Sequence, residues 1–204
     1  WGHYTADDPF FPPSMREIAV IDSPTHCDLT LGNRDVFLTG RDYLLISHDL
    51  SNSGAPKIVF DLAQMLREQW HYVLVVSPVD GPFKERLLEL GADVMIDGLC
   101  LTPHADAFVN LACNFDAVIA NTIVCWPAIN RLARLTPCFW YIHETTLVGH
   151  LSRAHPELGR DAGFAHVWAG SKMAHGGLEE IGIDSQVIEY GLDEAAPQPR
   201  TRKS

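Results

Sequence analysis

The fold is decided by residues 43–56, which read YLLISHDLSNSGAP. The stretch opens with the apolar run YLLI, and so short a run is typical of a strand covered on both faces. A polar loop follows. Pro56 then fits the first turn of a helix, where the missing N–H of proline is not needed. Apolar residues at helical spacing extend this helix to Leu66. The stretch therefore predicts one strand–loop–helix unit.

The same unit recurs along the chain. Strands are predicted at residues 72–76, 93–96, 117–120, 139–142, 166–169 and 186–188, and helices at 83–90, 105–113, 123–135 and 171–181. A further short strand is predicted at 18–21, and residues 143–165 are expected to be irregular. Parallel neighbours need long crossovers, whose handedness places helices on both faces of the sheet. The pattern predicts an α/β fold with a Rossmann-like, doubly wound parallel sheet.

Composition excludes several classes of protein. The chain has 204 residues, of which 47% are hydrophobic and 20% charged, so disorder and coiled coil are ruled out. No apolar run approaches the roughly 20 residues of a membrane-spanning helix. A net charge of −11 argues against nucleic acid as a partner. Five cysteines without a CxxC pair indicate reduced, buried thiols, and no metal site is expected.

In such sheets, ligands bind beyond the carboxyl ends of the strands, where the strand order reverses. The loop at residues 47–55 ends at a helix start, whose free N–H groups favour phosphate, and Gly54 lets a phosphate come close. The loop is neither a GxGxxG nor a GxxxxGK[ST] motif, which argues against nicotinamide cofactors and P-loop hydrolysis. The alternative is an ordinary loop in which Ser53 caps the helix.

Two further strand ends carry polar side chains. His143 and Glu144 follow residues 139–142, where the histidine can stabilise developing charge and the glutamate can bind sugar hydroxyls or orient a loop. Asn121 and Thr122 follow residues 117–120 and either hold an acceptor or cap the next helix. For each pair, a purely structural role stays open.

Two other motifs are assigned structural roles. The sequence SHD at residues 47–49 spells the residues of a hydrolase triad, but adjacent side chains at a strand end point in different directions and cannot form the relay. No GxSxG elbow is present either. Ser171 is expected to cap the helix that begins at Lys172, and Lys172 is a weak candidate for a phosphate contact.

Taken in order, these motifs resemble the N-terminal domain of GT-B glycosyltransferases of family 4 (group 1). The similar segments are LISHDLSNSGAP at 45–56, HYVLVVSP at 71–78, DAVIANT at 116–122, WYIHE at 140–144, WAGS at 168–171 and VIEYGLD at 187–193. The resemblance implies one half of a GT-B architecture. It divides the chain into an N-terminal extension (1–42), an acceptor-side domain (43–193) and a linker (194–204) towards an absent C-terminal domain.

The resemblance also implies a reaction and a set of roles. It implies a retaining, hexosyltransferase-type enzyme that moves a sugar from a nucleotide-diphosphate donor to a hydroxyl acceptor and is inactive as a fragment. Gly54 and Ala55 would face the donor phosphates and His143 would contact the transferring sugar. The acceptor would be bound by Ser53, Asn121, Thr122 and Glu144. Many relatives have a second glycine in the first loop, where this chain has one. No Asp-x-Asp pair is present, which disfavours the metal-dependent GT-A class.

The implied partners are a nucleotide-sugar donor as co-substrate, a saccharide or lipid-linked acceptor, and the chain's own C-terminal GT-B domain, with neither metal nor other cofactor. The implied location is the cytoplasm, and peripheral attachment of the full-length protein to the inner membrane is left open. Two alternatives to a transferase remain. One is a non-catalytic Rossmann-like binding module, and the other is a nucleotide-sugar epimerase of GT-B type.

Overall fold

The structure, a computed structural model, describes residues 27–33, 38 and 40–190. The strand predicted at residues 18–21 lies outside this range, as do the extreme termini. The described strands are β1 (Cys27–Thr30), β2 (Asp42–Ile46), β3 (Tyr72–Ser77), β4 (Asp93–Asp97), β5 (Ala117–Asn121), β6 (Cys138–Ile142), β7 (His166–Ala169) and β8 (Gln186–Val187).

These strands form one sheet in the order β1-β4-β3-β2-β5-β6-β7-β8. All neighbours are parallel except β1, which pairs antiparallel with β4 at the edge. The chain winds outward from β2 to β4 on one side and from β5 to β8 on the other, so the order reverses between β2 and β5. The predicted doubly wound, Rossmann-like sheet is confirmed, and β1 is an addition that the sequence pattern did not reveal.

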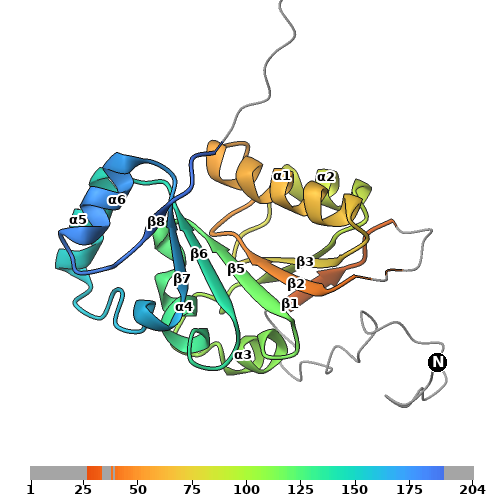
Figure 1. Ribbon diagram of the computed structural model, residues 1–204. Coiled ribbons are helices and arrows are strands. Elements are labelled where there is room, and N and C mark those ends of the chain that lie inside the picture. The colour runs from red at the N-terminus through yellow and green to blue at the C-terminus, as the bar shows by residue number, and fades with distance from the viewer. Residues whose placement is uncertain (1–26, 34–37, 39, 191–204) are drawn as a thin grey trace, which may run out of the picture.

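Helices lie on both faces of this sheet (Figure 1). They are α1 (Gly54–Glu68), α2 (Phe83–Glu89), α3 (Asp106–Ala112), α4 (Trp126–Leu132), α5 (Thr146–Ala154) and α6 (Lys172–Glu179), with 3-10 turns η2 (Ile123–Cys125) and η3 (Ala162–Phe164). One core cluster joins α1 and α2 to one face, and a larger cluster joins α3 to α6 to the other. The fully buried Trp140 belongs to the larger cluster.

Helix α1 shows how the sequence pattern becomes packing. Val59, Ala63 and Leu66 recur at helical spacing and are buried against the sheet. The helix begins two residues before Pro56, which therefore lies in its first turn as predicted. Trp70 has a positive φ of 64° and turns the chain towards β3. Burial of the apolar stripe thus fixes the direction in which the amino end of α1 points.

Three local predictions need correction. Residues 143–165 are not irregular throughout, because α5 occupies Thr146–Ala154 with only Val148 fully buried. The single helix expected at 123–135 is divided into η2 and the shorter α4, because Pro127 has no N–H and fits the first turn of α4 instead of a helix interior. All five cysteines are free, as predicted, but Cys113 is exposed and Cys27 only half-buried.

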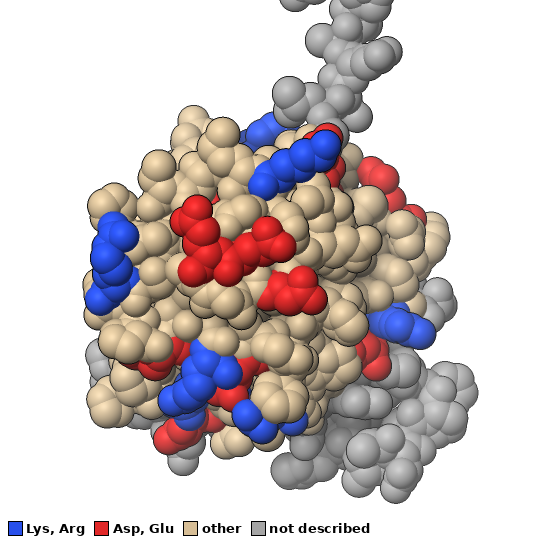
Figure 2. All heavy atoms as spheres, turned by 60° about the vertical axis from the view of Figure 1, so that its left-hand side comes forward, with Lys and Arg blue, Asp and Glu red and all other residues tan. Residues whose placement is uncertain are grey.

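The surface carries separated groups of charge. Figure 2 shows acidic side chains gathered near the centre of one face, with basic side chains in smaller groups around them. Within the described part of the chain, none of the helices has the length and hydropathy that a bilayer-spanning segment requires.

Asp161 ties the loop before β7 to the segment that follows α4, and its ion pairs predict a pH-dependent stability. Its buried carboxylate accepts hydrogen bonds from Arg134 Nε (2.7 Å) and Arg160 Nε (3.0 Å), which lower the pKa of the carboxyl group. A lowered folded-state pKa contributes stability above the unfolded pKa of about 4, and this contribution is lost as the pH falls through the lower value. Urea unfolding should therefore find Asp161→Asn less stable than wild type at neutral pH, with a difference that shrinks below about pH 4.

The exposed Asp184 supplies the control, because Asp184→Asn should match the wild type across the same series. A stability gap for Asp161→Asn that stays constant from neutral to acidic pH would contradict this assignment.

Candidate functional site

The carboxyl ends of β2, β5, β6 and β7 meet at one edge of the sheet, where the strand order reverses. Register places the last residue pairs of these strands side by side, with Ile46 opposite Ala120 and Ile142 opposite Ala169. Asn121 therefore ends β5 at the same edge at which the first loop follows β2 and His143 follows β6, as predicted. This is the position at which α/β sheets bind their ligands.

The amino end of α1 faces this edge. Ser53 occupies the N-cap position, but its side chain makes no capping hydrogen bond, so the alternative in which Ser53 caps the helix is not borne out. Lys57 N bonds to Ser53 O at 3.4 Å and Pro56 has no N–H. Within the described residues, the N–H groups of Gly54 and Ala55 make no hydrogen bond. Nothing lies within 4 Å of a β-carbon built on Gly54, so the helix start is open on that side.

Asn121 connects the end of β5 to this helix. Its side chain is 4% exposed, and Nδ2 donates to the carbonyl oxygen of Ala55 at 2.9 Å. Burial raises the pKa of the Cys125 thiol to about 12, so the thiol stays protonated and donates to the Asn121 main-chain oxygen at 3.0 Å. The Asn121 amide is thus fixed at the switch point instead of capping the next helix.

His143 and Glu144 directly follow the end of β6. The carboxylate oxygen Oε2 of Glu144 accepts hydrogen bonds from the main-chain N–H groups of His143 and Ile123, both at 3.2 Å. These bonds match the expectation that Glu144 orients a loop, and its contact with an acceptor stays a prediction. His143 is half-buried, and its Nε2 atom has no hydrogen-bond partner among the described residues.

Tyr141 and Gly170 complete this wall, and neither was assigned a role from the sequence. A β-carbon on Gly170 would lie 2.8 Å from the Tyr141 hydroxyl oxygen and 3.0 Å from Cβ of His143, so glycine lets β7 end this close to β6. The Tyr141 and His143 rings lie 6.1 Å apart. Alternation along β6 puts residues two apart on one face, and this signal was available in the sequence.

Partnerless polar atoms gather at this edge. In the described part of the chain, the buried atoms without a hydrogen-bond partner include His48 Nδ1, Asn121 Oδ1, Tyr141 OH and His143 Nε2. All four residues lie at or next to the carboxyl ends of β2, β5 and β6. Buried polar groups are normally paired, so such a cluster indicates a site that a polar ligand or ordered water completes.

The remaining predicted residues lie as follows. Thr122 is fully buried, and its hydroxyl lies 4.0 Å from the Cys125 sulfur. Ser53 is exposed, and its hydroxyl accepts from Ser51 Oγ at 3.1 Å. The acceptor contacts expected of both residues stay predictions.

Ser47, from the SHD sequence, and Ser171, at the start of α6, both have structural roles. Ser47 Oγ donates to the main-chain oxygen of Asp49 at 2.6 Å, so it is engaged in a turn. At α6, Ser171 is the N-cap as predicted, and its Oγ accepts from Ala174 N at 3.1 Å.

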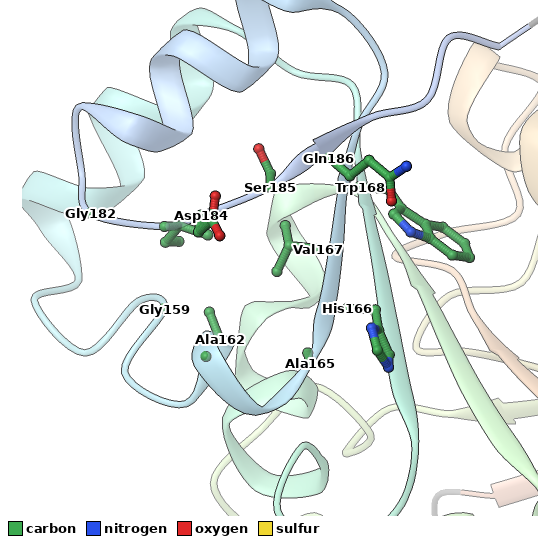
Figure 3. A pocket seen from close by; sticks show the side chains of 12 residues that line it. Gly159, Ala162, Ala165, His166, Val167, Trp168, Gly182, Asp184, Ser185 and Gln186 are labelled. Carbon is green, nitrogen blue, oxygen red and sulfur yellow. The ribbon is translucent and has the colours of Figure 1, made fainter.

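A cavity of about 410 Å³ lies elsewhere, beside the amino ends of β7 and β8 (Figure 3). Glycine and alanine residues form much of its wall, together with Val167, Ile183 and Asp184. The side chains of Trp168 and Gln186 project to the other side of these strands (Figure 3). This cavity is at the opposite end of β7 from Gly170, so it is distinct from the candidate site.

Comparison with known proteins identifies the family of the chain. The family model described as glycosyl-transferase family 4 matches residues 39–161, which include β2 to β6 and α5. The chain belongs to this family. A search of curated protein sequences found none that matches the chain.

Solved structures agree in fold. The chain is similar to Anabaena Alr3699/HepE in complex with UDP-glucose, with a TM-score of 0.61 and 23% identity over 76% of this chain and 45% of that chain. The complex of the same protein with UDP and glucose gives the same values. The family 4 chain therefore has the Rossmann-like fold of GT-B glycosyltransferases, and it spans less than half the length of HepE.

Proposed function

We propose that this chain is the acceptor-side half of a retaining glycosyltransferase, which moves a hexosyl group from a nucleotide-diphosphate donor to a hydroxyl acceptor on a saccharide or lipid carrier. The observation that carries the proposal is the convergence, in a family 4 chain, of free N–H donors at Gly54 and Ala55 with the buried Asn121 amide and the His143 imidazole. HepE binds UDP-glucose in its crystal structure, which supports a nucleoside-diphosphate sugar as the donor class.

The proposed chemistry follows from where charge develops. As the bond between sugar and diphosphate stretches, negative charge builds on the leaving phosphate. The Gly54 and Ala55 N–H groups, at the positive end of a 15-residue helix, stabilise that charge. Donors aimed at developing charge lower the barrier more than they strengthen substrate binding. His143 contacts the transferring sugar on the open side of β6, and Ser53, Asn121, Thr122 and Glu144 are proposed on the acceptor side.

The site is proposed to need a second wall. An open half-cleft does not exclude water, and transfer to a hydroxyl acceptor competes with hydrolysis. We therefore propose that a C-terminal GT-B domain of the same protein closes the cleft and binds most of the donor. The chain by itself is then expected to be inactive.

Titration calorimetry with UDP-glucose tests the division of the site. The 204-residue chain should bind this donor weakly at most, and the full-length protein should bind it saturably. In the full-length protein, Gly54→Val should weaken donor binding by about tenfold or more, because the new side chain fills the space before two charge-stabilising donors. Gly163→Val is the matched control, since a β-carbon at Gly163 also meets nothing within 4 Å.

Each result bears on a different part of the proposal. Tight donor binding by the short chain would show that the division into halves is wrong. Equal donor affinity in both valine variants would remove the phosphate site from α1. Release of an epimerised donor sugar would favour the epimerase. Transfer by the full-length protein that is unaffected by Gly54→Val and His143→Ala would mean that this half takes no part in the chemistry, which would favour a non-catalytic module.

A further inference from the structure

Thr122 has a backbone conformation that few residues other than glycine adopt. Its φ is 82° and its ψ is 154°. In this region the β-carbon of an ordinary residue collides with its own backbone, and such residues persist only where their surroundings hold them. Thr122 lies directly after β5, at the reversal of strand order. Strain of this kind occurs preferentially at functional sites.

Hydrogen bonds hold this turn on both sides. Thr122 N donates to the carbonyl oxygen of Tyr141 at 2.8 Å, and the carbonyl oxygen of Thr122 accepts from Trp140 Nε1 at 2.7 Å. The next N–H group, that of Ile123, donates to Glu144 at 3.2 Å. Three partners from β6 and its following loop therefore clamp two successive peptide groups.

The clamped turn lies between two proposed ligand-binding groups. Asn121 precedes it and spans to Ala55, while the Glu144 carboxylate that accepts from Ile123 also accepts from the N–H of His143. Rotation of the Thr122 peptides towards an ordinary conformation would break the bonds to Trp140 and Tyr141. The same rotation would displace the Asn121 side chain and release one of the two N–H groups that fix Glu144 beside His143.

We infer that Thr122 is a positioning residue, whose strained backbone, held by Trp140, Tyr141 and Glu144, sets Asn121 and His143 for the sugar-nucleotide substrate. The inference rests on the proposed function for the identity of the substrate. It assigns Thr122 a role through its backbone, in addition to any contact of its hydroxyl.

Release of the clamp and its repair test this role. Trp140→Phe removes the indole N–H, so Thr122 is free to relax, and kcat for transfer from UDP-glucose by the full-length protein should fall about tenfold to a hundredfold with a smaller change in KM. Thr122→Gly added to Trp140→Phe should give a higher kcat than Thr122→Ala added to it, because glycine adopts the same φ without strain whereas alanine keeps the β-carbon. Both substitutions remove the Thr122 hydroxyl, so the difference between the two double variants reports on the backbone alone. All rates are compared at a temperature where circular dichroism shows each variant folded.

Two readouts do not depend on the substrate. Thr122→Gly should have a higher Tm than Thr122→Ala, the reverse of the order at an ordinary backbone position. In ¹⁵N-labelled protein, the Asn121 side-chain amide resonances should shift in Trp140→Phe and return in the double variant with glycine.

The inference is overturned if Thr122→Gly has the same Tm as the alanine variant or a lower one, or if glycine and alanine restore Trp140→Phe equally. If the wild-type protein transfers no sugar from any nucleotide donor, the proposed function fails. The Tm order and the Asn121 resonances then still decide whether the clamp exists.

Discussion

His143→Ala in the full-length protein is expected to lower kcat for sugar transfer by about 10²- to 10³-fold, which is the effect of removing one preorganised group from developing charge. His143 follows β6, with its Nε2 atom unpartnered, its ring 6.1 Å from that of Tyr141 and its Cβ beside Gly170. Because we propose that His143 acts mainly in the transition state, KM for the donor should change much less than kcat. Steady-state transfer of labelled glucose from UDP-glucose measures both.

The exposed His150 on α5 provides the control, since His150→Ala changes the same residue type near the same end of the sheet without touching the candidate site. Its kcat should equal that of the wild type. A His143→Ala enzyme with wild-type kcat would remove His143 from the reaction. A proportional loss in both variants would indicate a general effect on folding.

Trp140→Ala is expected to cost about 3–5 kcal/mol of unfolding free energy through lost packing. Trp140 is fully buried in the larger core cluster, and its Nε1 donates to the carbonyl oxygen of Thr122. Truncation also leaves that buried oxygen without a partner, which adds about 1–3 kcal/mol. The sum is a large part of the 5–15 kcal/mol that stabilises a typical domain.

Because Trp140→Ala can prevent folding altogether, Trp140→Phe provides the quantitative measurement. Phenylalanine retains most of the packing but not the N–H donor, so its Tm should fall by several degrees in calorimetry. Trp70→Phe is the matched control, because Trp70 is 53% exposed and should tolerate the exchange. Equal Tm values for the two phenylalanine variants would contradict the assigned role of the Trp140 indole.

Local pattern predicted most of the fold. The apolar runs at β2, β3, β4, β5, β6 and β7 are strands within one residue of their predicted bounds, because strands buried on both faces need continuous apolar sequence. The pattern did not reveal β1, whose edge position leaves it only partly buried. It also missed α5, because most of that helix lies at the surface and its sequence includes glycine.

The candidate site divides in the same way. The sequence by itself determined which loops carry polar groups, since a polar residue after a buried strand can be recognised from its neighbours alone. Only the tertiary structure decided that Asn121 bonds to Ala55, that one Glu144 oxygen fixes two N–H groups, and that Thr122 is held at a positive φ. Such contacts join residues up to 66 positions apart, and they exist only once the strand order brings β2, β5 and β6 together. Periodicity is a local property of the chain, whereas strand order is set by the packing of the whole sheet.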